Sequence, residues 1–231
     1  MNLLSLTYPE LERLLKFFAG VTVVLAALIG LLRWAAFGAS EWAAVWQGVT
    51  TALSISALAF GFFSRMTWTS PKLAKWLGRP IVHGLWFGNL DSNYDDKKGA
   101  PPPQIEIAFV IRQTYLTLSI ESFTKNQDGE SKVEALLQNS KTEATRIGYI
   151  YELSKLYQGK SSKTSGAGEL KLHEAGKRLK GHYWTNSPTQ GLIELDFVTR
   201  DIDGVDNFEV AAKIWGLAQR PDAPTRSGGA S

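Results

Sequence analysis

Two uncharged apolar segments near the N-terminus constrain this chain more than any other feature. Residues 17–32 carry no charge between Lys16 and Arg33, and residues 42–64 carry none between Glu41 and Arg65. A helix rises about 1.5 Å per residue and the hydrocarbon core of a bilayer is about 30 Å thick, so the second segment can span it. The first segment can also span it, if Leu14 and Leu15 extend it and the flanking basic side chains snorkel. The sequence therefore predicts a hairpin of two transmembrane helices over residues 1–66.

A cleaved signal peptide or a buried core hairpin would also be apolar. A signal peptide needs a basic leader, whereas this leader holds Glu10 and Glu12 beside its two basic residues, and a second apolar segment follows. The distribution of basic residues favours a membrane hairpin with both termini in the cytoplasm. The basic residues on the two outer flanks are Arg13, Lys16, Arg65, Lys72, Lys75 and Arg79, whereas the short connection holds only one basic residue, Arg33.

Small residues recur at helical spacing in both apolar segments. They are Ala26 and Gly30 in the first, and Ala44, Gly48, Ala52 and Ser56 in the second. Small side chains let helix backbones approach closely in lipid. Two interpretations stay open, because this face can pack the two helices of one hairpin or pack partly between protomers.

The second half of the chain alternates apolar and polar residues, which is typical of half-buried antiparallel strands. Ile105, Ile107, Phe109 and Ile111 are one example, and Val133, Ala135 and Leu137 form the expected inward face of a later strand. Eight such segments with mostly short connections predict an eight-stranded antiparallel up-and-down β-barrel, lipocalin-like, over residues 81–200. The expected strands lie at residues 83–90, 105–111, 116–121, 133–137, 147–153, 170–172, 179–185 and 193–197.

The remaining segments are expected to connect or extend these two parts. Residues 67–80 read as a juxtamembrane linker, and residues 154–166 as a flexible basic loop. Residues 201–218 form a C-terminal extension with either a short helix or a last strand, and residues 219–231 are expected to be a disordered tail.

The sequence offers little for catalysis. It has no cysteine, and its three histidines do not have the spacing of metal ligands. Nucleotide-binding and hydrolase motifs are missing from it. We therefore predict no catalytic residue, no metal and no cofactor. The net charge of +3 is too small to indicate a long nucleic acid as partner.

Aromatic and basic residues in the barrel indicate binding instead. Aromatic rings can stack bases, and arginine side chains can hold phosphates. We expect Trp86, Tyr149, Tyr151 and Tyr183 to line a ligand site, and Arg112, Thr185, Thr199 and Arg200 to hold phosphate or ribose. Alternatively, the aromatic residues fill the barrel and the arginines lie at its rims.

Four stretches after the two apolar segments resemble a known family. They are HGLWFGNL, GYIYEL, LKGHYWTN and GLIELDFVTR, in that order. The chain resembles the membrane effectors of bacterial CBASS anti-phage systems, in which two transmembrane helices are fused to a minimal β-barrel that senses cyclic dinucleotides. The resemblance implies a partner CD-NTase that makes the ligand, homo-oligomerisation, and disruption of the inner membrane in abortive infection. The competing interpretations are a membrane-tethered, lipocalin-like carrier of an apolar ligand and a structural barrel that binds nothing.

Overall fold

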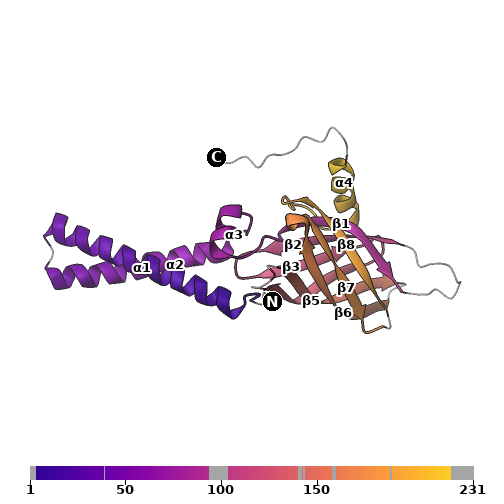
Figure 1. The fold of residues 1–231 in the computed structure, drawn as a ribbon, viewed down its shortest axis with the longest axis horizontal. Helices are drawn as coiled ribbons and strands as arrows, with labels where there is room; N and C mark the ends of the chain where they lie inside the picture. The colour runs from indigo at the N-terminus through magenta and orange to yellow at the C-terminus, as the bar shows by residue number, and fades with distance from the viewer. Residues whose placement is uncertain are drawn as a thin grey trace. The chain divides into compact units, whose positions relative to one another are not determined.

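The computed structural model describes residues 4–38, 40–93, 104–139, 142, 144–157, 160–187 and 189–219. The chain divides into two compact units. The helical unit comprises Leu6–Pro80 together with Thr114–Leu116, and the barrel unit comprises the rest of the chain. Figure 1 labels the helices and all the barrel strands except β4.

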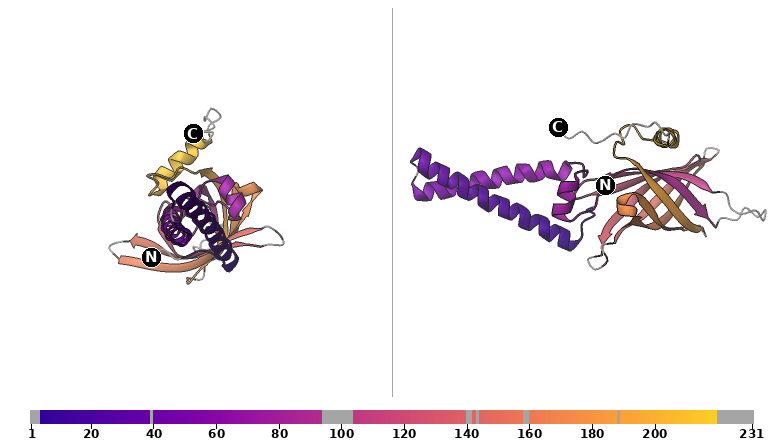
Figure 2. Two further views of the ribbon diagram at one scale, coloured as in Figure 1. Left: turned by 90° about the vertical axis from the view of Figure 1, so that its left-hand side faces the viewer. Right: turned by 45° about the horizontal axis from the view of Figure 1, so that its top comes forward.

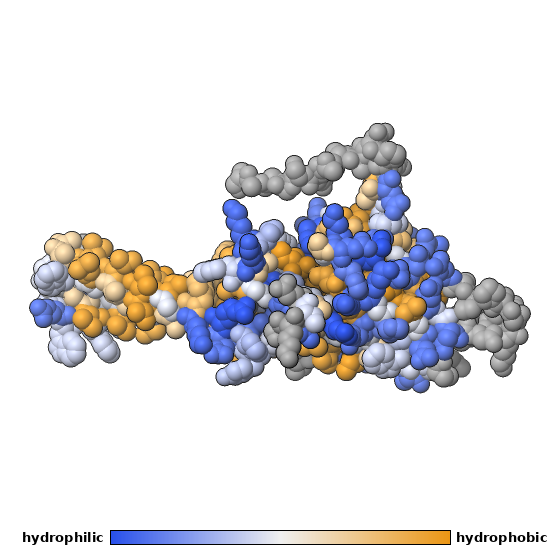
Figure 3. Space-filling model, in the orientation of Figure 1, coloured by the Kyte–Doolittle hydropathy of each residue, from blue (hydrophilic) through white to orange (hydrophobic). Residues whose placement is uncertain are grey.

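Two long antiparallel helices, α1 (Tyr8–Phe37) and α2 (Glu41–Arg65), form the predicted hairpin of the helical unit. Both are long and apolar enough to cross a membrane, and hydrophobic residues cover most of the middle of the hairpin in Figure 3, with hydrophilic ones at its tip. Helix α1 begins at Tyr8, ahead of the uncharged segment, because Glu10 caps its N-terminus. The Glu10 carboxylate accepts hydrogen bonds from the amide (2.8 Å) and hydroxyl (2.9 Å) of Thr7, the N-cap residue. It ends at Gly38, which has the left-handed conformation that glycine adopts without strain.

The base of the hairpin is a packed structure. The segment expected to be a linker contains α3 (Pro71–Leu77) and the fully buried side chains of Trp68 and Arg79. Arg79 forms an ion pair with Glu10 at 3.0 Å, and the Trp68 indole donates to the Arg79 carbonyl at 3.1 Å. The ring of Tyr115 lies edge-on to Trp68 with centroids 5.0 Å apart, and its hydroxyl donates to the Glu10 carbonyl at 3.3 Å. This buried network makes residues 67–80 and the turn Thr114–Leu116 part of the helical unit.

The barrel unit confirms the predicted fold, because its strands close in sequence order from β1 to β8 with antiparallel neighbours throughout (Figures 1 and 2). Their bounds are β1 (Gly84–Ser92), β2 (Ile105–Gln113), β3 (Leu118–Phe123), β4 (Asp128–Gln138), β5 (Thr145–Tyr157), β6 (Lys160–His173), β7 (Arg178–Thr185) and β8 (Gln190–Thr199). Alternate residues of these strands build the buried interior, including Phe109, Ile147, Leu170 and Leu195.

Two predictions about the barrel strands are wrong. The expected loop at residues 154–166 is mostly strand, because β5 continues to Tyr157 and β6 begins at Lys160. On β4 the expected inward face points outward, with Val133 44% and Leu137 47% exposed. The reason is a β-bulge: Ser131 faces Tyr151 and Val133 faces Ile150, so Lys132 is an extra residue that reverses the alternation.

The C-terminal extension forms a helix, α4 (Phe208–Ala218), and not a last strand. Asn207 caps it by accepting a hydrogen bond from the Val210 amide at 2.9 Å. The helix covers the outer face of β1 and β2, where Trp215 stacks on Phe87 with centroids 5.5 Å apart. Of the predicted tail, only Gln219 lies within the described residues.

Candidate ligand-binding site

Three tyrosines gather inside the barrel on the two strands that flank β6. Tyr149 and Tyr151 belong to β5 and Tyr183 to β7, and all three side chains are buried. The rings of Tyr149 and Tyr151 lie 5.6 Å apart at 35°. Between these strands, β6 presents Gly168 opposite both Tyr149 and Tyr183, and Gly166 opposite Tyr151.

The two glycines of β6 are needed because the tyrosine rings lie directly over them. A Cβ atom on Gly168 would sit 2.5 Å from Cζ of Tyr149, and one on Gly166 would sit 2.5 Å from Cζ of Tyr151. Such distances are far below van der Waals contact. The missing side chains therefore let both rings lie directly against the backbone of β6.

The tyrosine hydroxyls stay protonated and can donate hydrogen bonds. Burial raises the pKa of Tyr149 and of Tyr151, and neighbouring tyrosines raise both further. Burial also raises the pKa of Tyr183, against a hydrogen bond with Ser92 that lowers it. Among the described residues, the buried Tyr149 hydroxyl has no hydrogen-bond partner. A buried donor without a partner is costly, which points to a ligand that supplies an acceptor.

A carboxylate shares this interior. Glu134 is only 8% exposed and lies opposite Tyr149 in the β4–β5 register. The Ser131 hydroxyl accepts a hydrogen bond from the Ile120 amide at 2.8 Å and donates its own hydrogen to Glu134. The interior is therefore partly polar, which does not match the purely apolar lining expected of a carrier for apolar ligands.

Comparison with known families gives this site its context. A family model described as Cap15, cyclic dinucleotide receptor domain, matches residues 78–196, more than half of the chain. The chain belongs to the Cap15 family. Cap15 membership indicates a CBASS effector that senses cyclic dinucleotides, and its matched domain is a receptor domain and not a catalytic one. Comparison with curated proteins finds no match.

Of the predicted ligand residues in the Cap15 domain, the structure brings together the three tyrosines and Thr185. Thr185 lies opposite Gly166 and so follows Tyr151 around the barrel. Its hydroxyl is already engaged within the β7–β8 connection, where it lies 2.6 Å from the Thr189 hydroxyl. It therefore borders the tyrosine cluster and stabilises the neighbouring loop.

The other predicted residues lie elsewhere in the Cap15 domain. Trp86 is fully buried, and its indole donates to the Val82 carbonyl at 2.9 Å, so it has the contacts of a core residue. Thr199 is the last residue of β8, whereas the residue of β8 opposite Tyr183 is Gly191, about 25 Å away along the strand. Arg200 lies beside Thr199, where it stacks over Phe197 at 4.2 Å and donates to the His83 carbonyl.

Arg112 is also separate from the tyrosine cluster. It lies on the outer face of β2, where it forms an ion pair with Glu121 of β3. The Arg112 side chain is 47% exposed, so this surface ion pair contributes little to the stability of the fold. Arg112 and Arg200 thus lie apart from the tyrosine cluster, although Arg200 lies over Phe197, whose ring is 5.2 Å from that of Trp86.

Sequence reasoning missed Glu134, Ser131, Gly166 and Gly168. A bulge leaves no trace in a period-two pattern, so nothing in the sequence indicated that Glu134 points inward. The glycines carried a usable signal, because GAG at residues 166–168 pairs in reverse with YIY at residues 149–151. Glycines facing aromatic residues across a strand pair indicate rings that cover the glycine backbone.

The small-residue face of the second apolar segment lies against α1. Ala44, Gly48, Ala52 and Ser56 are the buried residues of α2. A Cβ atom on Gly48 would sit 2.6 Å from the Ala26 carbonyl oxygen and 3.0 Å from the Gly30 amide nitrogen. The Ser56 hydroxyl accepts a hydrogen bond from Thr22 at 2.8 Å. This arrangement corresponds to the first of the two open interpretations, packing within one hairpin.

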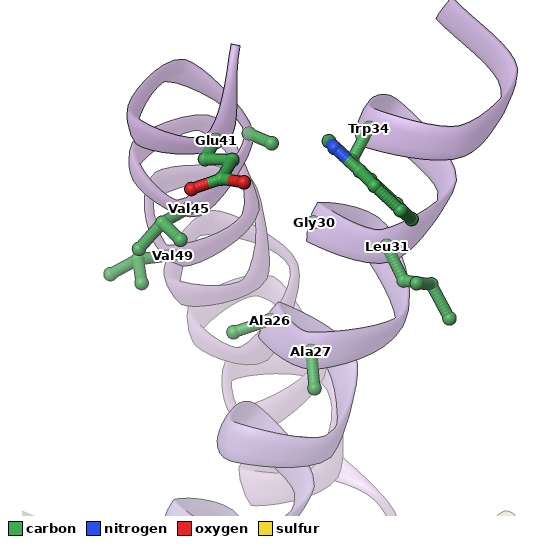
Figure 4. Close-up of a pocket in the computed structure, with 9 residues that line it drawn as sticks. Ala26, Ala27, Gly30, Leu31, Trp34, Glu41, Val45 and Val49 are labelled. Carbon is green, nitrogen blue, oxygen red and sulfur yellow. The ribbon is translucent and has the colours of Figure 1, made fainter. Parts of the chain in front are cut away.

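The two helices separate beyond this contact. A pocket of about 370 Å³ opens between them near the α1–α2 connection, with Trp34 of α1 and Glu41 of α2 on its two sides (Figure 4). Its other lining residues are Ala26, Ala27, Gly30, Leu31, Ala44, Val45 and Val49, so its walls are almost wholly apolar.

Proposed function

We propose that this Cap15 chain is an inner-membrane CBASS effector whose barrel binds a cyclic dinucleotide through the tyrosine cluster. In this proposal a partner CD-NTase makes the ligand during phage infection. Binding drives homo-oligomerisation, and the two apolar helices then disrupt the membrane. The observation that carries the proposal is the set of three buried tyrosines, Tyr149, Tyr151 and Tyr183, with protonated hydroxyls inside the matched receptor domain.

The tyrosines suit a ligand that combines flat bases with phosphates. Their rings supply stacking faces, worth about 1–3 kcal/mol per base. Their hydroxyls supply donors for phosphate oxygens, and a hydrogen bond to a charged group is worth about 1.5–3 kcal/mol. A micromolar sensor requires about 8 kcal/mol, so two stacked bases and two such hydrogen bonds are of sufficient size. We assign the phosphate contacts to these hydroxyls, with Thr185 beside them, in place of Arg112, Thr199 and Arg200.

The proposal places both termini in the cytoplasm, as the distribution of basic residues predicts. The ligand is made in the cytoplasm, so a sensor on the other side of the membrane would not meet it. A reporter fused after Ser231 tests this orientation, and an extracytoplasmic C-terminus would contradict the proposal.

Ligand binding drives assembly only if the assembled state binds the ligand more tightly than the resting state. The full chain in detergent should therefore bind at least one of a panel of cyclic dinucleotides, as measured by calorimetry. The same ligand should increase its oligomer size in sedimentation and release dye from vesicles that contain the chain. Absence of binding to every member of the panel refutes the sensor, whereas binding without dye release refutes only the output step.

A further inference from the structure

The side chain of Glu134 is buried inside the barrel, where a ligand bound at the tyrosine cluster would face it. The bulge at Lys132 turns it into the barrel, where it is flanked along β4 by the inward residues Ser131 and Leu136. It lies opposite Tyr149, and Cβ atoms of directly opposed residues in antiparallel strands are about 4.5–5.5 Å apart. A carboxylate buried without a cation is costly, so its retention inside the barrel calls for a partner.

The carboxylate is held in one orientation with spare acceptor capacity. The Ile120 amide fixes the Ser131 oxygen, and the Ser131 hydroxyl donates to Oε1 of Glu134. Among the described residues this is the contact that Glu134 makes, and none of the ion pairs between them includes it. A carboxylate has about four lone-pair sites, so the second oxygen can accept from a ligand.

The chemistry of a cyclic dinucleotide restricts what Glu134 can meet. Its two phosphates are anionic and are repelled by a carboxylate in a medium of low dielectric constant. Its bases carry N–H groups on their Watson–Crick edges, and proteins read stacked bases by hydrogen bonds to these edges. Guanine presents adjacent N1–H and N2–H donors there, whereas adenine presents one donor beside an acceptor that a carboxylate repels.

We propose that Glu134 is a specificity-determining residue that selects a guanine base stacked on Tyr149. The hypothesis rests on the proposed function, since it requires the interior to bind a cyclic dinucleotide. In this arrangement the ring of Tyr149 supports the face of the base, and Glu134 on the neighbouring strand accepts hydrogen bonds from its edge. Ser131 is a positioning residue, because it acts on the ligand only through the carboxylate.

Titration of the full chain in detergent with cyclic di-GMP, cyclic GMP–AMP and cyclic di-AMP tests this inference. The wild-type protein should prefer the ligands that contain guanine. Glu134→Gln should weaken their binding by about 10- to 100-fold, the equivalent of one hydrogen bond to a charged group. The same variant should change binding of cyclic di-AMP by less than about threefold. Ser131→Ala should give a smaller loss in the same direction.

Glu130→Gln is the matched control. Glu130 lies on the same strand, but it is 67% exposed and forms an ion pair with Lys132, so its variant should bind as the wild type does. If the wild type binds no member of the wider panel of cyclic dinucleotides, the proposed function fails. If it binds them with no preference for guanine, or if Glu134→Gln leaves all affinities unchanged or lowers them equally, the proposed function stands and the role of Glu134 is refuted. Thermal melting of each variant shows whether an equal loss of affinity for all ligands comes from unfolding of the variant.

Discussion

Replacing Gly168 with alanine should displace the ring of Tyr149 and weaken ligand binding. The new Cβ would lie 2.5 Å from Cζ and 2.6 Å from Oη of that tyrosine. Contacts between carbon atoms are favourable at about 3.5–4.0 Å, so the ring must move by about 1 Å. It has little room, because Phe109 lies edge-on at 5.8 Å and Tyr151 packs at 5.6 Å.

The expected cost follows from this crowding. Overpacking of a buried site costs about 1–3 kcal/mol, which lowers the melting temperature of a protein of this size by several degrees. Displacement of a stacking ring should weaken binding by about 5- to 150-fold, equivalent to 1–3 kcal/mol. Both quantities can be measured on the full chain in detergent, by thermal melting and by titration with the tightest-binding cyclic dinucleotide.

Gly148→Ala provides the comparison. Gly148 precedes Tyr149 on β5, and a Cβ atom there would have nothing within 4 Å. That variant should melt and bind as the wild type does. If Gly168→Ala is equally silent, the ring of Tyr149 does not lie over β6 in solution, which refutes the proposed packing of the tyrosine cluster.

Three further predictions concern the hairpin, its base and the dependence on pH. Gly48→Leu drives a side chain into the backbone of α1, so it should abolish membrane disruption in a phage-infection assay while ligand affinity is retained. Gly61→Leu adds its side chain at an open position and should leave membrane disruption unchanged. Glu10→Gln removes the carboxylate charge from the buried ion pair with Arg79, and should lower the unfolding free energy by about 3–5 kcal/mol in denaturant titrations. Because burial raises the pKa of Tyr149, the folded state keeps this proton to a higher pH than the unfolded state does. The free energy of unfolding should therefore fall above pH 10 by about 1.4 kcal/mol per pH unit for this group. In Tyr149→Phe, the melting temperature should fall less steeply with pH between pH 9 and 11.

The sequence was sufficient for the architecture. Uncharged segments of sufficient length indicate the helices, and alternation with short connections indicates an up-and-down barrel, because both signals come from local periodicity. The grouping of Tyr149, Tyr151 and Tyr183 could also be predicted, since inward-facing aromatic residues on nearby strands of a closed barrel share its interior.

Long-range pairing set the limits of prediction. The partner of Arg112 is decided by the β2–β3 register, and strand ends with similar composition can belong to opposite ends of a barrel, as Thr185 and Thr199 do. Residues 67–80 looked like a linker, yet Arg79 is fully buried and forms an ion pair with Glu10, 69 positions earlier in the chain. No local pattern contains this information.

The bulge in β4 has a consequence for how receptors of this kind can diverge. It consists of one extra residue, Lys132, and the parity of every residue from there to the strand end depends on it. Deletion of Lys132 would remove the bulge and restore a regular ladder, in which Val133 still faces Ile150 and Glu134 still faces Tyr149. A receptor of this kind can therefore gain or lose the bulge in one codon and keep the carboxylate inside the barrel, although its distance from Ser131 along the sequence changes.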